Sequence, residues 1–255
     1  MINKYGIILL LLISNLAQAQ LMEKIKTRSN GGDPANPTSL FTRYDSHFAL
    51  RFDSKYYHIG NLWSLAYAFN NKNQVGANAL LAFSSKSDKV GIGDIEIRYA
   101  TMPLLDSSAI LSALGFNLVV QIPSGSLEKD LGIGAFRVTP GVIANFKFTK
   151  WFFIVPDLRY IFTSKIVQSV PDSTINNSLH GIDAAMRFVF KPTKSSWFWL
   201  TPALTSFDLS NSTTDFELEI LYGWIILNRI GLTASFSRNF TTDAYLFQFI
   251  NSIYF

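Results

Sequence analysis

Hydrophobic and polar residues alternate with a period of two along most of this chain. The alternation starts near residue 42, and short turn signals rich in Gly, Pro, Asn and Asp interrupt it. Such alternation is the pattern of β-strands whose two faces meet different surroundings. It predicts twelve strands, at residues 42–53, 57–69, 74–84, 91–101, 109–122, 133–147, 151–163, 179–191, 197–207, 215–226, 229–239 and 243–255.

The two faces of these strands differ in side-chain size as well as in polarity. In one strand Phe216 and Leu218 share a face, while Glu217 and Glu219 share the other. Elsewhere the polar face carries small residues such as Ser64, instead of the Lys and Glu that would coat a soluble β-sandwich. Large apolar side chains suit contact with lipid, and small ones suit a crowded, wet barrel interior. The predicted strands are longer than the roughly 5–6 residues typical of soluble sheets, and they reach the roughly 9–11 residues that a tilted membrane strand needs.

The connections between the strands give an independent indication. If the N-terminus starts in the periplasm, the two longest connections, 123–132 and 164–178, fall on the outer side. Short periplasmic turns and longer outer loops are typical of bacterial outer-membrane barrels. The sequence therefore predicts an all-β fold, a transmembrane antiparallel up-and-down β-barrel of about twelve strands of the bacterial outer-membrane type. We expect a monomer in the Gram-negative outer membrane, with outer-membrane lipid as its surroundings.

Composition and charge narrow the class of protein further. Hydrophobic residues make up 48% and charged residues 16% of the chain, and the charged share lies below the roughly 25% of an ordinary soluble domain. The chain has no cysteine, which excludes disulfides and thiolate metal sites. The net charge of +4 comes without a long Lys/Arg run, so we expect no nucleic-acid partner.

The N-terminus has the features of a cleavable export signal. Lys4 precedes an apolar run at residues 6–13, and Ala17-Gln18-Ala19 is a small-x-small cleavage site. The run is too short for a spanning helix, which needs about 20 apolar residues. We therefore expect a signal peptide at 1–19, an irregular lead-in at 20–41 that can plug the lumen, and the barrel at 42–255.

Aromatic residues gather on the predicted lipid face, many of them near the periplasmic strand ends. Outer-membrane barrels typically carry such a girdle of aromatic side chains at the level of the lipid headgroups. The last strand ends in an alternating aromatic series that closes on Phe255, and this series resembles the C-terminal signature that the barrel-assembly machinery recognises. The predicted girdle comprises Tyr67, Phe69, Tyr99, Phe146, Phe148, Phe152, Phe188, Phe190, Phe198, Trp224 and Phe255.

The alternation places charged side chains of both signs inside the barrel. One interpretation is a network of ion pairs that stiffens the wall, and another is a polar pathway without strong ion selectivity. Side chains fill the interior of a barrel of about eight strands, whereas a barrel of about 16–18 strands encloses an aqueous channel. A barrel of twelve strands therefore permits a narrow passage. The predicted lumen-lining residues are Arg43, Asp45, Arg51, Asp94, Glu96, Arg98, Arg137, Asp157, Arg159, Asp183, Arg187, Glu217 and Glu219. The strand at 197–207 fits the pattern least well, because it turns Trp197 and Trp199 inward.

The histidines of the chain give little indication of an enzyme active site. His180 lies close to Ser178 in the sequence, but this spacing shows nothing about geometry and does not identify a third catalytic residue. His47 and His58 lack a metal-ligand spacing. We therefore expect no enzyme, no cofactor and no metal site, and we keep a lipid-modifying enzyme as the least favoured alternative.

Several glycine-containing segments carry a family resemblance. Gly91-Ile92-Gly93-Asp94 with its following strand, Gln121-Ile122-Pro123-Ser124-Gly125, and Leu131-Gly132-Ile133-Gly134 resemble the "MetA-pathway of phenol degradation" group of outer-membrane proteins. The matched block covers about residues 91–162. The resemblance implies an outer-membrane barrel for the uptake of aromatic or hydrophobic compounds.

The sequence thus predicts a passive outer-membrane channel or transporter for small molecules, hydrophobic or aromatic ones included. The main alternative is a structural or surface-interaction barrel whose lumen is closed. The two differ in whether solutes cross the lumen.

Overall fold

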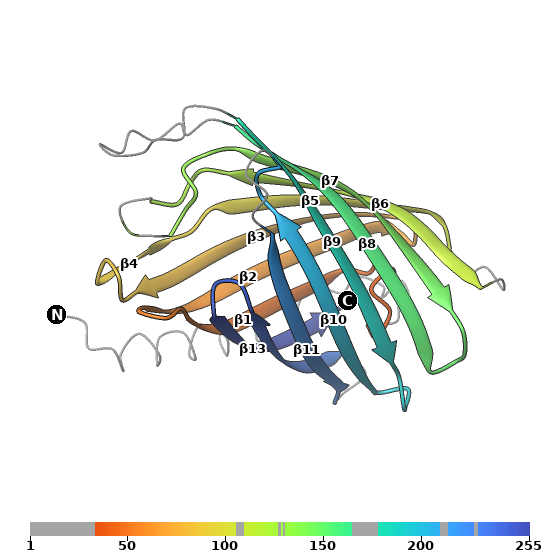
Figure 1. The fold of residues 1–255 in the computed structure, drawn as a ribbon. Helices are drawn as coiled ribbons and strands as arrows, with labels where there is room; N and C mark the ends of the chain where they lie inside the picture. The colour runs from red at the N-terminus through yellow and green to blue at the C-terminus, as the bar shows by residue number, and fades with distance from the viewer. Residues whose placement is uncertain are drawn as a thin grey trace.

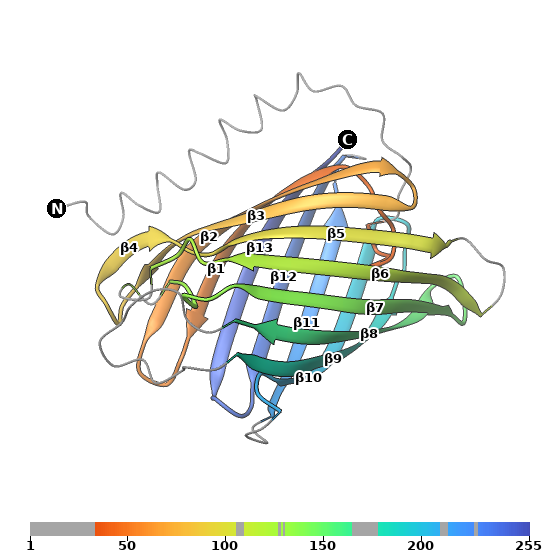
Figure 2. The ribbon, with the colours of Figure 1, turned by 90° about the horizontal axis from the view of Figure 1, so that it is seen from above.

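The chain forms one closed antiparallel barrel, seen from two directions in Figures 1 and 2. The computed structural model describes residues 34–105, 110–126, 129, 131–164, 178–209, 214–226 and 229–255. The predicted signal peptide at 1–19, residues 20–33 of the lead-in and residues 165–177 of the longest connection lie outside these residues. Among the described residues, no helix is long and apolar enough to cross a membrane.

Neighbouring strands pair in chain order, and β1 closes the barrel by pairing with β13 as well as with β2. The strands are β1 (Arg43–Phe52), β2 (Tyr57–Asn70), β3 (Asn73–Ser84), β4 (Lys89–Ile92), β5 (Ile95–Leu104), β6 (Leu111–Ile122), β7 (Arg137–Lys147), β8 (Phe152–Thr163), β9 (Leu179–Phe190), β10 (Ser196–Ser206), β11 (Asp215–Ile225), β12 (Ile230–Asn239) and β13 (Ala244–Tyr254). The short β4 and the longer β5 both pair with β3 and form the two parts of one barrel strand. The barrel therefore has twelve strands, as the alternation predicts.

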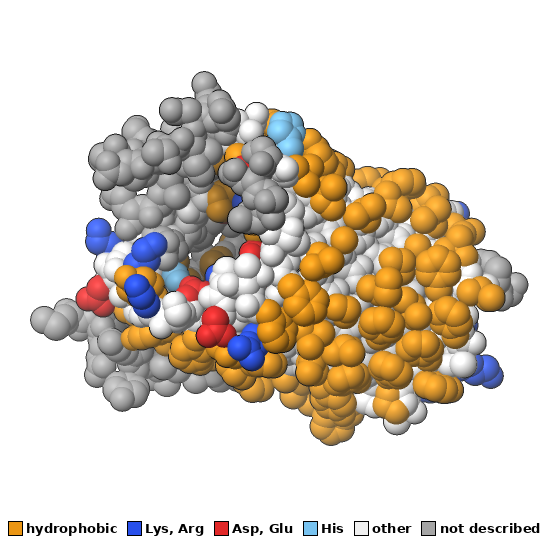
Figure 3. Space-filling view, in the orientation of Figure 1, with side chains coloured by type: hydrophobic (Ala, Val, Ile, Leu, Met, Phe, Trp, Pro, Cys, Tyr) orange, Lys and Arg blue, Asp and Glu red, His pale blue; other side chains and the backbone are white. Residues whose placement is uncertain are grey.

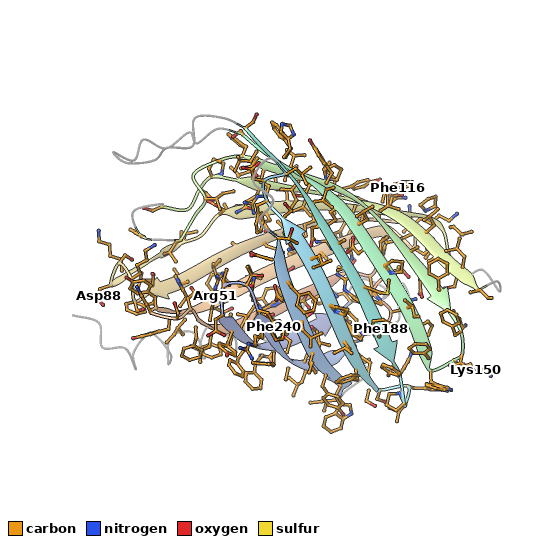
Figure 4. The ribbon with its side chains drawn as sticks, viewed as in Figure 1. Arg51, Asp88, Phe116, Lys150, Phe188 and Phe240 are labelled. Carbon is orange, nitrogen blue, oxygen red and sulfur yellow. The ribbon has the colours of Figure 1, made fainter. Side chains whose placement is uncertain are left out.

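The alternation separates an outer face from an inner face. Leu158 and Tyr222 on the outer face are 57% and 52% exposed, whereas Val155 on the inner face is fully buried. Hydrophobic side chains cover the visible outer wall in Figure 3, and charged side chains gather at the ends of the barrel. Figure 4 places Asp88 at one end and Lys150 at the other, and we use these residues to name the two ends.

The predicted strand at 91–101 is wrong in detail, because the structure divides it at Gly93 and Asp94. Leu81 pairs with Ile92 and Asn78 pairs with Glu96, so β3 has one residue fewer than its partner between these pairs. This arrangement is a β-bulge, which inserts an extra residue into one strand and locally interrupts pairing. The bulge lets apolar residues on both sides of it, at 58% and 36% exposure for Ile92 and Ile95, face outward.

The predicted strand at 133–147 is also wrong at its start, since β7 begins only at Arg137. The backbone N–H of Ile133 donates to Asp94 and is therefore not available for strand pairing. Gly134 follows with a φ of 64°, a left-handed conformation that a strand residue does not adopt. These two features hold residues 133–136 outside the sheet.

The predicted lipid-facing position of Phe255 is wrong as well. Its exposure is only 6%, and its backbone N–H donates to the carbonyl of Thr42. Phe255 follows the last residue of β13, so the period of two no longer decides the direction of its side chain. Other residues of the predicted girdle, Tyr67 and Trp224 among them, are exposed on the outer wall.

Candidate functional site: the barrel lumen

A cavity of about 380 Å³ occupies the lumen. Residues of β1 to β3 and of β5 to β10 border this central cavity, and its charged side chains come from β1, β5, β7, β8 and β9. The polar lining also includes amides and hydroxyls such as Gln74, Asn117 and Thr139. Six of the predicted lumen-lining residues border this cavity, namely Arg43, Glu96, Arg98, Arg137, Arg159 and Asp183.

Ion pairs join many of the inward charges. Arg43 pairs with Asp45 at 2.9 Å, and Arg98 pairs with Glu96 at 2.7 Å. These partners lie two residues apart on one strand, so the period of two brings them to the same face. These contacts support the interpretation that inward charges form a network of ion pairs that stiffens the wall.

The most buried part of this network is centred on Asp157. Its carboxylate is bonded by the Nε of Arg159 at 3.0 Å and lies 3.3 Å from the Nη1 of Arg187, and Asp157 is 3% exposed. Arg159 also reaches Asp183 at 3.7 Å. One carboxylate on β8 thus holds guanidinium groups from β8 and β9 against the inner wall.

A second cavity of about 560 Å³ opens at the Asp88 end. Arg51 and Asp53, 3.1 Å apart, supply part of its charged lining. Its other walls are largely apolar, with Leu62, Leu80 and Leu246 among them. A smaller cavity of about 210 Å³ borders Arg51 and reaches Glu217 on β11. This end of the lumen therefore combines apolar walls with a few charges.

Two predicted lumen residues on β11 stand apart from the network. Within the described part of the chain, neither Glu217 nor Glu219 has an ion-pair partner within 4.0 Å. Glu219 lies in register with Thr201 and Ser237 on the neighbouring strands. Glu219 is thus flanked by hydroxyl residues of the neighbouring strands, whereas Glu217 is flanked by Ala203 and Asn239.

Asp94 has a different place from the other predicted lumen residues. It lies in the bulge between β4 and β5, and its carboxylate accepts hydrogen bonds from the backbone N–H groups of Gly125 and Ile133, each at 2.8 Å. The side-chain amide of Gln121 adds a third at 2.9 Å. Asp94 therefore ties the connection between β6 and β7 to the wall.

Residues 34–41 lie against the inner face of the barrel. The Nδ2 of Asn145 donates to the Oδ1 of Asn36 at 2.9 Å, and the indole N–H of Trp199 donates to the carbonyl of Ala35 at 3.2 Å. Leu40 packs into a buried apolar cluster with residues such as Val155, and Thr38 is fully buried. These contacts explain why β10 departs from the pattern, since its inward Trp197 and Trp199 pack against this segment.

The histidines show no catalytic arrangement in the described part of the chain. The Nδ1 of His180 is hydrogen bonded to the phenol of Tyr160, and no contact joins it to Ser178. His47 is buried, and neither of its ring nitrogens has a hydrogen-bond partner. No group of three or more His, Cys, Asp or Glu among the described residues could hold a metal ion.

The prediction from sequence missed the uncharged members of the lumen. It selected charged residues and so omitted Gln74, Asn117, Thr205 and Phe207, all of which line the central cavity. The signal was present, because the alternation already placed Thr205 and Phe207 on the inner face together with Trp197 and Trp199. The contacts of residues 34–41 carried no comparable signal, since that segment has no periodicity.

No protein-family model matches the chain, so none confirms the family resemblance of residues 91–162, and no curated protein matches it. Solved structures do share its fold. The COG4313 outer membrane channel from Pseudomonas putida F1 has a TM-score of 0.67 at 11% identity, over 88% of this chain and 98% of that chain. The NanC porin has a TM-score of 0.60 at 9% identity, over 82% and 98%. The KdgM porin in complex with disordered oligogalacturonate has a TM-score of 0.59 at 8% identity, over 84% and 99%. The chain thus has the closed twelve-stranded antiparallel fold found in outer-membrane channels and porins.

Proposed function

We propose that this chain is an outer-membrane channel that admits small molecules by passive diffusion. The observation that carries the proposal is a closed barrel with an apolar outer wall and cavities of about 380 and 560 Å³ in its lumen. An apolar band on the outside of a closed barrel is what a lipid bilayer requires. Concentration gradients drive the movement of solute, which needs no chemical reaction.

Small hydrophobic or aromatic molecules are the proposed class of solute. The family resemblance of residues 91–162 implies such compounds, and the apolar walls at the Asp88 end support them. Leu62, Leu80 and Leu246 offer an organic molecule a surface to contact before it reaches the polar central cavity. Burial of such a molecule's surface against these side chains would favour its entry.

Export and assembly form part of the same proposal. Residues 1–19 direct the chain across the inner membrane and are removed, and the strand ending at Phe255 engages the barrel-assembly machinery. The prediction is a mature N-terminus at Gln20 and recovery of a heat-modifiable monomer in outer-membrane fractions. A soluble periplasmic protein, or one that retains residues 1–19, would contradict it.

We also propose that residues 34–41 narrow the lumen. Their hydrogen bonds to Asn145 and Trp199 and the packing of Leu40 support this role. The same contacts favour the main alternative, a barrel with a closed lumen that serves structure or surface interactions. The two proposals differ in whether solute crosses the lumen.

Solute flux into proteoliposomes separates the channel from the closed barrel. Purified protein is reconstituted into liposomes, and swelling is followed with arabinose as the neutral solute. A channel gives swelling above protein-free liposomes, and Asn145→Ala, which frees Asn36 and Thr38, increases the rate. If neither the natural chain nor this variant admits arabinose, the lumen is closed and the channel proposal fails.

A further inference from the structure

More arginines than carboxylates line the central cavity. Four arginines line it, Arg43, Arg98, Arg137 and Arg159, against only two carboxylates, Glu96 and Asp183. Charges of one sign in a confined, low-dielectric space attract counter-charges more strongly than charges in open water do. The lumen is therefore predisposed to hold an anion, provided that one of these arginines is not already occupied.

Three of the four arginines already have carboxylate partners. Arg43 pairs with Asp45 at 2.9 Å, and Arg98 pairs with Glu96 at 2.7 Å. Arg159 is bonded to Asp157 through Nε at 3.0 Å. Their contribution to an incoming anion is therefore partly cancelled.

Arg137 differs from these three. No carboxylate in the described part of the chain lies within 4.0 Å of its guanidinium group. Its Nε donates to the hydroxyl of Thr163 at 3.2 Å, and its Cζ lies over the ring of Phe207 at 5.1 Å. These two contacts hold the side chain in place, and neither of them uses the terminal N–H groups.

The carboxylates of the same cavity are occupied by other groups. Glu96 accepts from the amide of Asn78 at 2.9 Å in addition to its pair with Arg98. Asp183 accepts from the hydroxyl of Thr205 at 2.9 Å and lies 3.7 Å from Arg159. Both acids thus already have partners of their own, and neither forms an ion pair with Arg137.

The surroundings of Arg137 also include apolar side chains. Val119, Ile161 and Phe207 line the same cavity, whose volume of about 380 Å³ is within the range of small-molecule sites. A planar guanidinium binds a carboxylate through two parallel hydrogen bonds, which a single point charge cannot do. A small molecule with a carboxylate on an apolar body would therefore find the guanidinium for its charge and apolar side chains for its body.

We propose that Arg137, supported by Thr163 and Phe207, is a binding site for small organic carboxylates that enter the lumen. The proposal rests on the proposed function, since it names the solute class of that channel. The carboxylate occupies the terminal N–H groups of Arg137, and the organic part contacts Phe207, Ile161 and Val119. The site selects for a negatively charged head on an apolar body.

The experiment uses benzoate and its neutral analogue benzamide as probes with the full barrel. Binding is measured by ligand-detected NMR in detergent, and flux is measured in proteoliposomes. Arg137→Gln should weaken benzoate binding by about tenfold or more, the size expected for a lost charge-assisted pair, and leave benzamide unchanged. Arg238→Gln is the matched control, because Arg238 pairs with Asp243 away from the central cavity.

Two further variants guard against a general disturbance of the fold. Arg137→Lys keeps the positive charge but cannot donate two parallel hydrogen bonds to a carboxylate. Its affinity for benzoate should lie between those of the natural chain and Arg137→Gln. Phe207→Leu removes the stacked ring and should weaken benzoate binding less than Arg137→Gln. Heat-modifiable migration confirms that each variant is folded.

The outcomes separate this site from the channel itself. Equal benzoate binding by the natural chain and Arg137→Gln would overturn the site, even if arabinose flux upholds the channel. An equal loss of benzoate and benzamide would also overturn it, because the effect would not depend on charge. Benzoate binding that Arg137→Gln abolishes, in a barrel that passes no solute, would uphold the site and contradict the channel.

Discussion

The carboxylate of Asp94 accepts a hydrogen bond of 2.8 Å from the backbone N–H of Ile133, across the connection that links β6 and β7. The same carboxylate holds the N–H of Gly125, and a Cβ added at Gly132 would lie 2.8 Å from its Oδ1. The glycine segments that carry the family resemblance therefore meet around one side chain. Their shared role in this structure is close approach to Asp94, since any larger residue at Gly132 would collide with it.

Asp94→Asn is expected to loosen this connection. An amide presents one NH2 group to backbone N–H donors, so at least one of the hydrogen bonds to Gly125 and Ile133 is lost. Hydrogen bonds to charged groups contribute about 1.5–3 kcal/mol each, and we expect a loss within that range. Urea unfolding in phosphocholine bilayers measures it. Asp88→Asn, in an exposed turn, is the control, and equal stability of both variants would contradict the role of Asp94.

Asp157→Asn should be more harmful than the loss of a surface ion pair. It leaves Arg159 and Arg187 without the carboxylate that both contact. Breaking a buried pair costs about 3–5 kcal/mol, and we expect the lower end because both arginines are partly exposed. Asp53→Asn, which breaks the more exposed pair with Arg51, should cost less than about 1 kcal/mol. A similar decrease in the free energy of unfolding for both variants would show that the Asp157 network does not stabilise the barrel.

Arginine on the outer wall tests the assignment of faces. Leu118 and Ile220 are 37% and 39% exposed on the outer face. Leu118→Arg and Ile220→Arg should each lower the free energy of unfolding in a bilayer by about 2–4 kcal/mol, the cost near the midplane. Val119→Arg is the matched control, because Val119 borders the central cavity. A smaller loss at both outer positions than at Val119 would reverse the faces.

Asn145→Ala should release residues 34–41 from the inner wall. The change removes the amide that donates to Asn36 and to Thr38. The chain has no cysteine, so Ser39→Cys, which leaves both acceptors of the Asn145 amide in place, can be labelled by a water-soluble thiol reagent. Labelling should be several-fold faster with Asn145→Ala, and Asn70→Ala at the exposed end of β2 should have no effect. Equal labelling rates in all three proteins would mean that Asn145 does not hold the segment.

The sequence predicted the strands and their faces well because each strand has two different surroundings, lipid and lumen. Period-2 patterning reports that contrast directly, as Leu158 and Val155 illustrate. It could not locate the bulge at Gly93 and Asp94, because the bulge depends on hydrogen bonds to residues more than thirty positions away.

The candidate site was only partly predictable for a related reason. Parity of position indicated that Arg137 faces inward, and it also placed Asp157 on the same face as Arg159, two positions away on one strand. It could not indicate the contacts of Arg137 with Thr163 and Phe207, which come from distant parts of the chain. The placement of residues 34–41 likewise depends on contacts with Asn145 and Trp199, far along the chain.

Single-channel recording in planar bilayers decides whether this barrel conducts ions through its lumen. Purified full-length barrel is added to a membrane of defined lipid, and current is recorded at constant voltage. We expect discrete, small conductance steps, because twelve strands leave a narrow passage and residues 34–41 narrow it further. We also expect larger steps for Asn145→Ala. A folded, inserted barrel that gives no steps with either protein would contradict the claim that this chain is a channel.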